Sequence, residues 1–198
     1  MQGPLSRILP LFVLAMWVTF GVWLAQGDWT GLNWLMLGTA VAACAIVFVD
    51  FTSIFNYGYA LTMTLVHVWI LVFRDVTTAS VLVSGLGLLF GLRLLAFTDR
   101  RRRSASYAPG RAAQREADTR IPMFVRVMIF VFVSTLMTFV GIPAYVVAQS
   151  GELDAWVVVG AVVMLVGLLV ESLADEQKQR AKRRDPRTFV RSGLFART

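Results

Sequence analysis

Long blocks of apolar residues alternate with short polar segments along this chain. Four of these blocks, residues 8–25, 34–49, 76–92 and 156–170, contain no charged side chain. A helix needs about 20 predominantly apolar residues to cross a hydrocarbon core roughly 30 Å thick. Because a soluble protein does not need such blocks repeatedly, the pattern predicts an all-α fold, a polytopic integral membrane helical bundle.

The polar segments between the blocks predict about six transmembrane helices in a single membrane domain. The run over residues 34–73 is too long for one helix, and we expect it to turn within residues 50–58, where polar and flexible residues gather. Gly141 and Pro143 predict a bend or break in the fifth span. The sixth helix is expected to continue into water through residues 171–183. We place the spans at about residues 8–26, 34–54, 57–73, 76–97, 121–148 and 155–170.

Composition supports the same class, because 57% of the 198 residues are hydrophobic and only 16% are charged. A soluble domain carries about 25% charged residues. The first apolar block is longer than the roughly 7–15 residues of a signal-peptide core, and no clear cleavage site follows it. We therefore interpret it as a retained first span.

The basic residues predict the orientation of the bundle. Seven of the nineteen lie in residues 99–120 and eight in residues 171–198, whereas residues 27–33 and 149–154 contain none. Because cytoplasmic segments carry the excess of lysine and arginine, both basic segments and both termini are expected in the cytoplasm. The net charge of +7 is thereby explained. The basic segments lack interleaved aromatics that could stack on bases, so we expect contact with anionic membrane lipid and no nucleic-acid partner.

The single cysteine and the single histidine exclude several kinds of site. One cysteine, Cys44, allows no disulfide within the chain and no cysteine metal site, and we predict no metal site. His67 lies in the middle of the third span and is expected to be a hydrogen-bonded helix contact. Gly87 and Gly91 form a small-xxx-small pattern that permits close helix approach, within the chain or between the chains of a homo-oligomer.

Polar residues near the predicted turn and near two helix ends are candidates for a site. Asp50 lies beside Tyr57 and Tyr59, and it is either an interfacial turn residue or part of a cavity lining. Arg93 and Arg126 lie near cytoplasmic helix ends, where their side chains can reach toward water or line a site. All of these residues are expected on the same face of the membrane as the basic segments.

The segment after the sixth span carries a stripe of charged residues. On a helix, Glu171, Asp175, Lys178 and Lys182 share one face. Spacing alone favours a solvated helix with acid–base pairs, each worth a few tenths of a kcal/mol. Asp185-Pro186 is expected to end this helix, and residues 192–195 are expected to form a turn back toward the membrane.

These motifs resemble one family of membrane proteins. The resemblance rests on five sequence elements: Val170-Glu171-Ser172-Leu173-Ala174-Asp175-Glu176-Gln177-Lys178, Asp185-Pro186-Arg187-Thr188-Phe189, Ser192-Gly193-Leu194-Phe195, Tyr57-Gly58-Tyr59, and Arg93 with Ser104-Ala105-Ser106-Tyr107. Together they resemble the steroid 5-alpha-reductase-like family of bacterial membrane proteins, in its domain-of-unknown-function branch. The resemblance covers about residue 50 to the end.

The resemblance implies a fold, a reaction and a cofactor. It implies an all-helical bundle in the bacterial cytoplasmic membrane that reduces an activated C=C bond of a lipophilic, steroid- or enone-like small molecule with NADPH bound at the cytoplasmic face. By resemblance, Glu171, Asp175 and Gln177 help to hold the cofactor, with Arg93, Ser106 and Tyr107 nearby. Tyr57 or Tyr59 would be the acid that polarises the substrate carbonyl, because a phenol donates a hydrogen bond and a proton.

The chain departs from the family after the Gly-Leu-Phe turn. There the family carries an arginine, a histidine or cysteine, a proline, an asparagine and a tyrosine, followed by further spans. This sequence ends at Thr198, and its only histidine is His67. We therefore expect either a fragment or a shortened relative whose cofactor pocket is completed by something else.

Three other functions compete with the reductase. A methyltransferase of the isoprenylcysteine carboxyl methyltransferase type has a similar tail but uses S-adenosylmethionine. A non-catalytic membrane scaffold or assembly partner agrees with the missing element. A transporter is the weakest alternative, because the sequence shows no clear inverted repeat.

Overall fold

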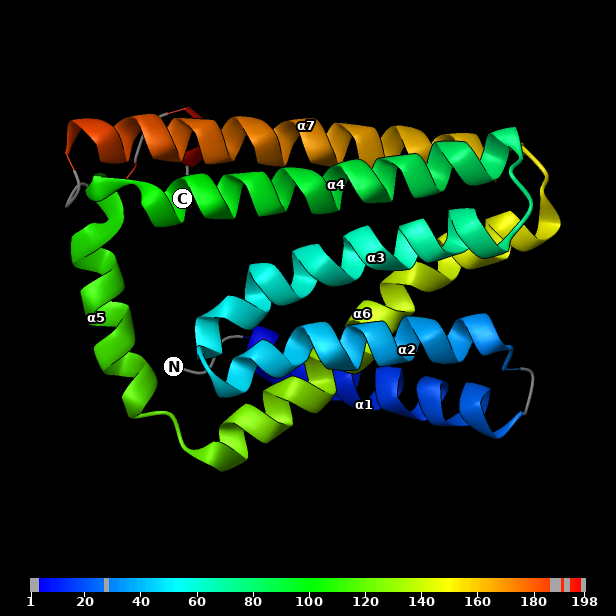
Figure 1. Ribbon diagram of the computed structural model, residues 1–198, viewed down its shortest axis with the longest axis horizontal. Helices are drawn as coiled ribbons and strands as arrows, with labels where there is room; N and C mark the ends of the chain where they lie inside the picture. The colour runs from blue at the N-terminus through cyan, green and yellow to red at the C-terminus, as the bar shows by residue number, and fades with distance from the viewer. Residues whose placement is uncertain (1–3, 27–28, 186–189, 191–192, 197–198) are drawn as a thin grey trace.

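The computed structural model describes residues 4–26, 29–185, 190 and 193–196, and its regular elements there are all helical (Figure 1). The α-helices are α1 Pro4–Ala25, α2 Gly31–Cys44, α3 Tyr57–Phe73, α4 Thr78–Arg103, α5 Ala108–Thr119, α6 Met123–Ser150 and α7 Ala155–Arg184. Four short 3-10 segments join or follow them, namely η1 Ala45–Phe48, η2 Phe51–Phe55, η3 Ala105–Tyr107 and η4 Gly193–Phe195.

Five helical segments are long and apolar enough to cross a membrane, which confirms the predicted all-α polytopic membrane bundle. They are Gly31–Phe48, Phe51–Phe73, Thr78–Arg103, Met123–Ser150 and Ala155–Arg184. The apolar part of α1 for which side chains are described, Leu14–Ala25, is shorter than any of these five segments. The helices run back and forth, so that α1, α3 and α6 begin at the end of the bundle where α2, α4 and α7 finish (Figure 1).

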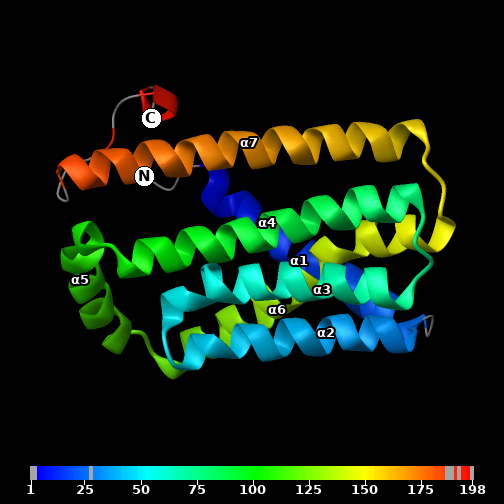
Figure 2. The ribbon, with the colours of Figure 1, turned by 45° about the horizontal axis from the view of Figure 1, so that its top comes forward.

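The helices form successive layers, which Figures 1 and 2 show from two directions. α3 packs between α2 and α4, and α6 crosses behind them in contact with α1, α2, α3 and α4. α7 lies along the outer side of α4. Apolar side chains from α2, α3 and α6 fill the middle, among them the fully buried Met36, Val66 and Val133. Cys44 is one of these buried apolar contacts.

Two glycines of α4 let that helix approach α3 closely. A Cβ atom on Gly87 would lie 2.1 Å from Nε2 of His67, and one on Gly91 would lie 2.4 Å from Oγ1 of Thr64. The small-xxx-small pattern is thus used for packing inside the chain. His67 is buried and its Nδ1 lies 2.7 Å from the carbonyl oxygen of Met63, which confirms it as a hydrogen-bonded helix contact.

Several element boundaries differ from the prediction. The second span leaves α-helical geometry at Cys44, before the predicted limit of residue 54, and continues as η1; Asp50 then caps η2 and starts a new turn at Phe51. α4 continues to Arg103 instead of residue 97, since its four terminal arginines are favourable at a helix C-terminus. Of the bend or break predicted in the fifth span, the break does not occur: α6 is continuous through Pro143, and the absent Cβ of Gly141 leaves space for Val66.

The described parts of the two basic segments are largely helical. Residues 99–120 comprise the last turn of α4, then η3 and α5, and Figure 1 shows α5 lying across the end of the bundle. The sixth helix continues beyond residue 170 to Arg184, as predicted. The expected helix stop at Pro186 and the start of the turn at Ser192 lie outside the described residues.

Candidate functional site

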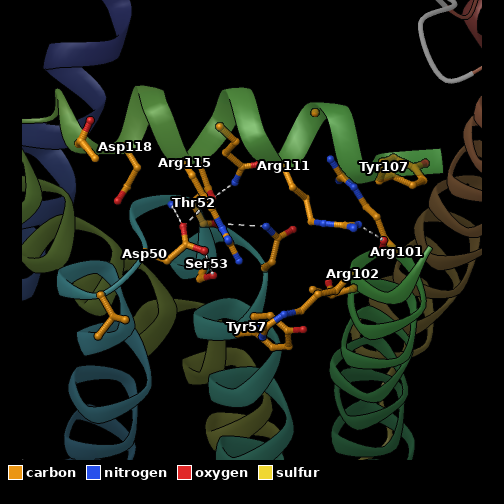
Figure 3. Close-up of a pocket in the computed structure, with 16 residues that line it drawn as sticks. Asp50, Thr52, Ser53, Tyr57, Arg101, Arg102, Tyr107, Arg111, Arg115 and Asp118 are labelled. Atoms are coloured by element: carbon orange, nitrogen blue, oxygen red, sulfur yellow. Dashed lines mark hydrogen bonds between the residues drawn. The ribbon is translucent and has the colours of Figure 1, made fainter. Parts of the chain in front are cut away.

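A cleft of about 560 Å³ opens at the end of the bundle that the basic residues predict to be cytoplasmic. Its floor is the turn between α2 and α3 together with the start of α3 and the end of α4, and its roof is α5 (Figure 3). Charged and polar side chains dominate the lining. They include Asp50, Thr52, Tyr57, Thr98, Arg101, Arg102, Tyr107, Arg111, Gln114, Arg115 and Asp118.

The roof is tied to the bundle through Asp118, near the end of α5. Its Oδ1 accepts a hydrogen bond of 2.8 Å from the backbone N–H of Phe51, and its Oδ2 pairs with Nη2 of Arg126 at 2.9 Å. Arg126 also donates from Nη1 to the carbonyl oxygen of Val47 at 2.6 Å. The Gln114 side chain donates to the hydroxyl of Thr52. These contacts fix α5 over the cleft, and they show that Arg126 binds protein groups instead of reaching toward water.

The carboxylate of Asp50 is held by donors of its own turn. It accepts hydrogen bonds from the N–H of Thr52 at 3.1 Å, the hydroxyl of Thr52 at 2.9 Å and the hydroxyl of Ser53 at 2.8 Å. Burial alone would raise the pKa of Asp50, but the hydrogen bonds from Ser53 and Thr52 outweigh it and lower the pKa below its usual value. Asp50 is therefore an ionised cap that shapes the floor of the cleft.

Four arginines line the cleft from two sides. Arg101 and Arg102 come from the last turn of α4, and their guanidinium carbons lie 4.9 Å and 5.9 Å from the ring centres of Tyr107 and Tyr57. Arg111 and Arg115 come from α5 (Figure 3). Within residues 4–185, gaps excepted, no carboxylate forms an ion pair with any of the four.

Arg111 is positioned by carbonyl oxygens. Its Nη1 donates to the carbonyl of Ser104 at 2.9 Å and, at 3.5 Å, to that of Arg101. This arrangement closes the connection between α4 and α5 and leaves the positive charge of the guanidinium uncompensated.

A second polar cluster joins α4 to α7. Nη1 of Arg93 donates to Oδ2 of Asp175 at 2.8 Å, and its Nη2 lies 2.8 Å from Oε1 of Glu171. The structure therefore brings together three of the residues that the sequence predicted for the cofactor. The side chains of Arg93 and Asp175 are 19% and 24% exposed, and Arg93 lies over the ring of Phe90, whereas the side chain of Glu171 is 44% exposed, so the cluster is only partly shielded from water.

Gln177 holds the turn near the end of the chain. Its Oε1 accepts a hydrogen bond of 2.9 Å from the N–H of Leu194. Gly193 has a φ of +64°, and a Cβ there would lie 2.4 Å from Oε1 of Gln177, so only glycine fits this turn without strain. The side-chain oxygen of Gln177 is thus used to anchor the tail on α7.

The other predicted residues divide between the cleft and the core. Tyr57 and Tyr107 line the cleft. Tyr59 packs against the apolar cluster of α2 and α6, with its ring centre 6.0 Å from that of Phe55, and does not line the cleft. Ser106 lies beside the cleft, where its Oγ is 2.7 Å from that of Ser104.

Some buried polar atoms at this end of the bundle have no hydrogen-bond partner among the described residues. In the cleft lining these are Oγ1 of Thr98 and Oη of Tyr107, and in α7 both amide atoms of Gln179. Burial raises the pKa of Tyr107 and the charge of Asp175 adds to this, while Arg101 and Arg183 oppose it. Tyr107 therefore stays a neutral phenol that can donate to a ligand.

The sequence interpretation missed the four arginines of the cleft as site residues. The abundance of arginine in residues 99–120 was explained by membrane topology and by attraction to anionic lipid. A signal was nonetheless present, because Arg111, Gln114, Arg115 and Asp118 have the spacing of one helix face, and all four line the cleft. Among the described residues, no group of three or more His, Cys, Asp or Glu side chains is placed to hold a metal ion.

The chain matches a model of a protein family. The family model described as "Protein of unknown function (DUF1295)" matches residues 47–198, which include the cleft and the cluster on α4 and α7. No curated protein and no solved structure matches the chain.

Proposed function

We propose, from the premise that the chain belongs to the DUF1295 family, that it is a reductase of the bacterial cytoplasmic membrane. The proposed reaction is the NADPH-dependent reduction of an activated C=C bond in a lipophilic, steroid- or enone-like molecule, by likeness to steroid 5-alpha-reductases. One observation carries the proposal. Arg93 meets Glu171 and Asp175 between α4 and α7, and the family resemblance implies all three at or near the cofactor; Asp175 also lies within electrostatic range of Tyr107.

The residues of this region fit the parts of a dinucleotide. Carboxylates such as Glu171 and Asp175 accept hydrogen bonds from sugar hydroxyls, and Arg93 fixes their orientation. When bound, NADPH would supply the hydride, and the protein would have to hold the nicotinamide against the substrate.

The proposal assigns the acid to Tyr57. This residue stands at the start of α3 in the cleft lining, whereas Tyr59 is packed among apolar side chains. A phenol at the cleft can donate a hydrogen bond to the substrate carbonyl, which stabilises the negative charge that develops on its oxygen during hydride transfer.

The test is a binding titration of the purified 198-residue chain in a mild detergent. NADPH fluorescence and the melting temperature of the protein are followed together. A ligand at 100 times its dissociation constant should add roughly 2.7 kcal/mol of stability. We expect saturable NADPH binding that Asp175→Asn weakens and that S-adenosylmethionine does not reproduce.

A matched control is available one residue along the same helix. Glu176 is also acidic, but it forms an exposed pair with Arg180 and lies outside the cluster. Glu176→Gln should bind NADPH as the unmodified chain does. Binding of S-adenosylmethionine alone would establish the methyltransferase instead. A folded sample that binds neither would contradict a cofactor site in this chain.

The scaffold alternative rests on a different observation, the outer surface of α7. Large apolar side chains such as Trp156, Val163 and Leu169 are exposed along this helix, which among the described elements packs mainly on α4. In a membrane this surface faces lipid or another protein. Failure of both cofactors to bind, together with co-purification of a defined membrane partner, would favour the scaffold.

A further inference from the structure

We infer that the arginine-lined cleft beneath α5 is a binding site for a phosphate group, carried either by an anionic lipid headgroup or by a soluble phosphate compound. This inference goes beyond the proposed reductase and stands without it, because it rests on the cleft and not on the cluster between α4 and α7.

The cleft carries excess positive charge. Four arginines line it against two carboxylates, and both carboxylates are already occupied. Asp50 is held by three donors of its own turn, and Asp118 by the N–H of Phe51 and by Arg126. In the part of the chain that the structure describes, the four arginines pair with no carboxylate. Like charges brought into one cleft repel, so a bound anion would reduce the electrostatic repulsion among the four guanidinium groups.

The arginines also converge from opposite walls. Arg101 and Arg102 extend from the end of α4, and Arg111 and Arg115 extend from α5 toward the same space (Figure 3). Arg111 is held in place by the carbonyl of Ser104, so part of the site is pre-organised. Guanidinium groups suit phosphate oxygens in particular, because their planar N–H pairs match the geometry of two oxygens on one phosphorus.

Neutral donors complete the site. The hydroxyls of Thr98 and Tyr107 lie in the lining, are buried, and have no partner among the described residues. A buried hydroxyl without a hydrogen bond costs free energy, and a ligand oxygen would satisfy it. Tyr107 is suited to this task because burial raises its pKa, so that it keeps its proton and donates. Cationic and neutral donors together describe a phosphate site better than a simple basic surface.

Topology alone does not explain the arrangement. Arg103 and Arg120 belong to the same basic segment, but each forms an exposed pair with a carboxylate four residues away, Asp99 and Glu116, and neither lines the cleft. These two arginines serve the positive-inside pattern as well as any others. The arginines of the cleft differ in being gathered around one cavity and left without counter-charge.

The position of the cleft allows either source of phosphate. It lies at the ends of membrane-spanning helices, level with the exposed apolar residue Val49, which also lines it. A lipid headgroup can enter from the membrane side and a soluble compound from the water side. Both kinds of ligand would present the same phosphate group to the arginines. A titration with one ligand of each kind distinguishes the two sources.

The experiment uses the full chain in dodecyl maltoside, which carries no phosphate. Inorganic pyrophosphate and dioctanoyl phosphatidic acid are titrated separately, and binding is followed by the melting temperature and by tryptophan fluorescence. We expect saturable binding of at least one probe. Arg102→Gln/Arg115→Gln should weaken it by roughly a hundredfold, since each lost charge-assisted hydrogen bond is worth about tenfold.

The matched control is Arg103→Gln/Arg120→Gln, which removes the same charge from the same segment. It should leave the affinity within about twofold, because exposed pairs of this kind contribute little. Binding of phosphatidic acid alone identifies a lipid headgroup site, and binding of pyrophosphate as well identifies a site for soluble phosphate compounds. The inference is overturned if neither probe binds, or if both double variants lose affinity equally, because that result describes diffuse attraction.

Two further readouts keep this test separate from that of the reductase. The melting temperature of each variant without ligand shows whether it folds. Asp175→Asn, which should impair NADPH binding, should still bind the phosphate probe with unchanged affinity. Loss of probe binding in this variant would place the phosphate between α4 and α7 and overturn the assignment to the cleft.

Discussion

Arg93 on α4 donates a hydrogen bond of 2.8 Å to Asp175 on α7, joining two residues 82 positions apart in the chain. Glu171, one turn earlier on α7, lies at the same distance from the other terminal nitrogen of Arg93. The arginine thus holds two carboxylates of one helix face that would otherwise repel each other. This contact is a principal polar connection between α7 and the rest of the bundle, since α7 packs mainly on α4.

Replacing Arg93 should therefore loosen α7. We expect Arg93→Ala to lower the free energy of unfolding by about 2 kcal/mol, because a charge-assisted hydrogen bond is lost and two neighbouring carboxylates remain unpaired. Thermal unfolding in detergent measures the loss. In a double-mutant cycle, Arg93 and Asp175 should show coupling, whereas Arg93 and Glu176 should be additive. Additivity in both cycles would contradict the contact.

The close approach of α3 and α4 gives a second prediction. Gly91→Ala places a Cβ 2.7 Å from the backbone nitrogen of Thr64, which cannot move without displacing α3. We expect a loss of stability of about 1–3 kcal/mol, the usual cost of overpacking. Gly85→Ala on the same helix meets nothing within 4 Å and should not be destabilising. Equal melting temperatures for the two variants would mean that the helices are farther apart than described.

The tie between Arg126 and Asp118 predicts a local effect on α5. Both side chains are largely buried, with exposed fractions of 10% and 17%. Removing the arginine leaves a shielded carboxylate without its partner, which costs about 3–5 kcal/mol in buried pairs. We expect Arg126→Met to release α5 from the bundle and to increase the rate of tryptic cleavage after Arg111 and Arg115.

A surface pair next to this tie provides the comparison. Arg120 and Glu116 are 75% and 71% exposed, and such pairs contribute roughly 0–1 kcal/mol. Arg120→Gln should leave cleavage at the two α5 sites unchanged. If Arg126→Met were cleaved no faster than Arg120→Gln, the proposed role of Arg126 in holding the roof of the cleft would be wrong.

The hydrogen bonds to Asp50 predict a dependence on pH. Its pKa lies below the ordinary value of 3.8, so the carboxylate contributes stability above that pH and loses it as the pH falls through the lower value in the folded state. Asp50→Ala should cost about 1 kcal/mol at neutral pH, as the loss of a cap does. The difference between the unmodified chain and Asp50→Ala should be constant above about pH 5 and shrink below about pH 4.

Melting temperatures of the two proteins between pH 3 and pH 7 measure this difference. Ser53→Ala, which removes one of the three hydrogen bonds to Asp50, should show a smaller effect in the same pH window. A difference that grows as the pH falls would show that the carboxylate destabilises the folded state, contrary to the geometry.

The sequence alone was sufficient for the class of fold and for the place of most helices, because hydrocarbon thickness imposes a length and a composition on every span. It also indicated that the turn at Asp50, the basic segment after α4 and the start of the tail belong to one end of the bundle. These features follow from local composition and from the alternation of membrane spans between the two sides of the membrane. They can be predicted without knowing which helices contact one another.

Which residues form a site was decided only by the tertiary structure. Arg93 could be assigned from the sequence either to water or to a site, and packing of α4 on α7 placed it between two carboxylates. Tyr57 and Tyr59 looked equivalent in sequence, yet a helix turns 100° per residue, so one faces the cleft and the other the core. Four arginines of residues 99–120 line one cavity because α5 lies across the end of the bundle. The sequence does not give this position of α5, so it could not show which arginines are neighbours.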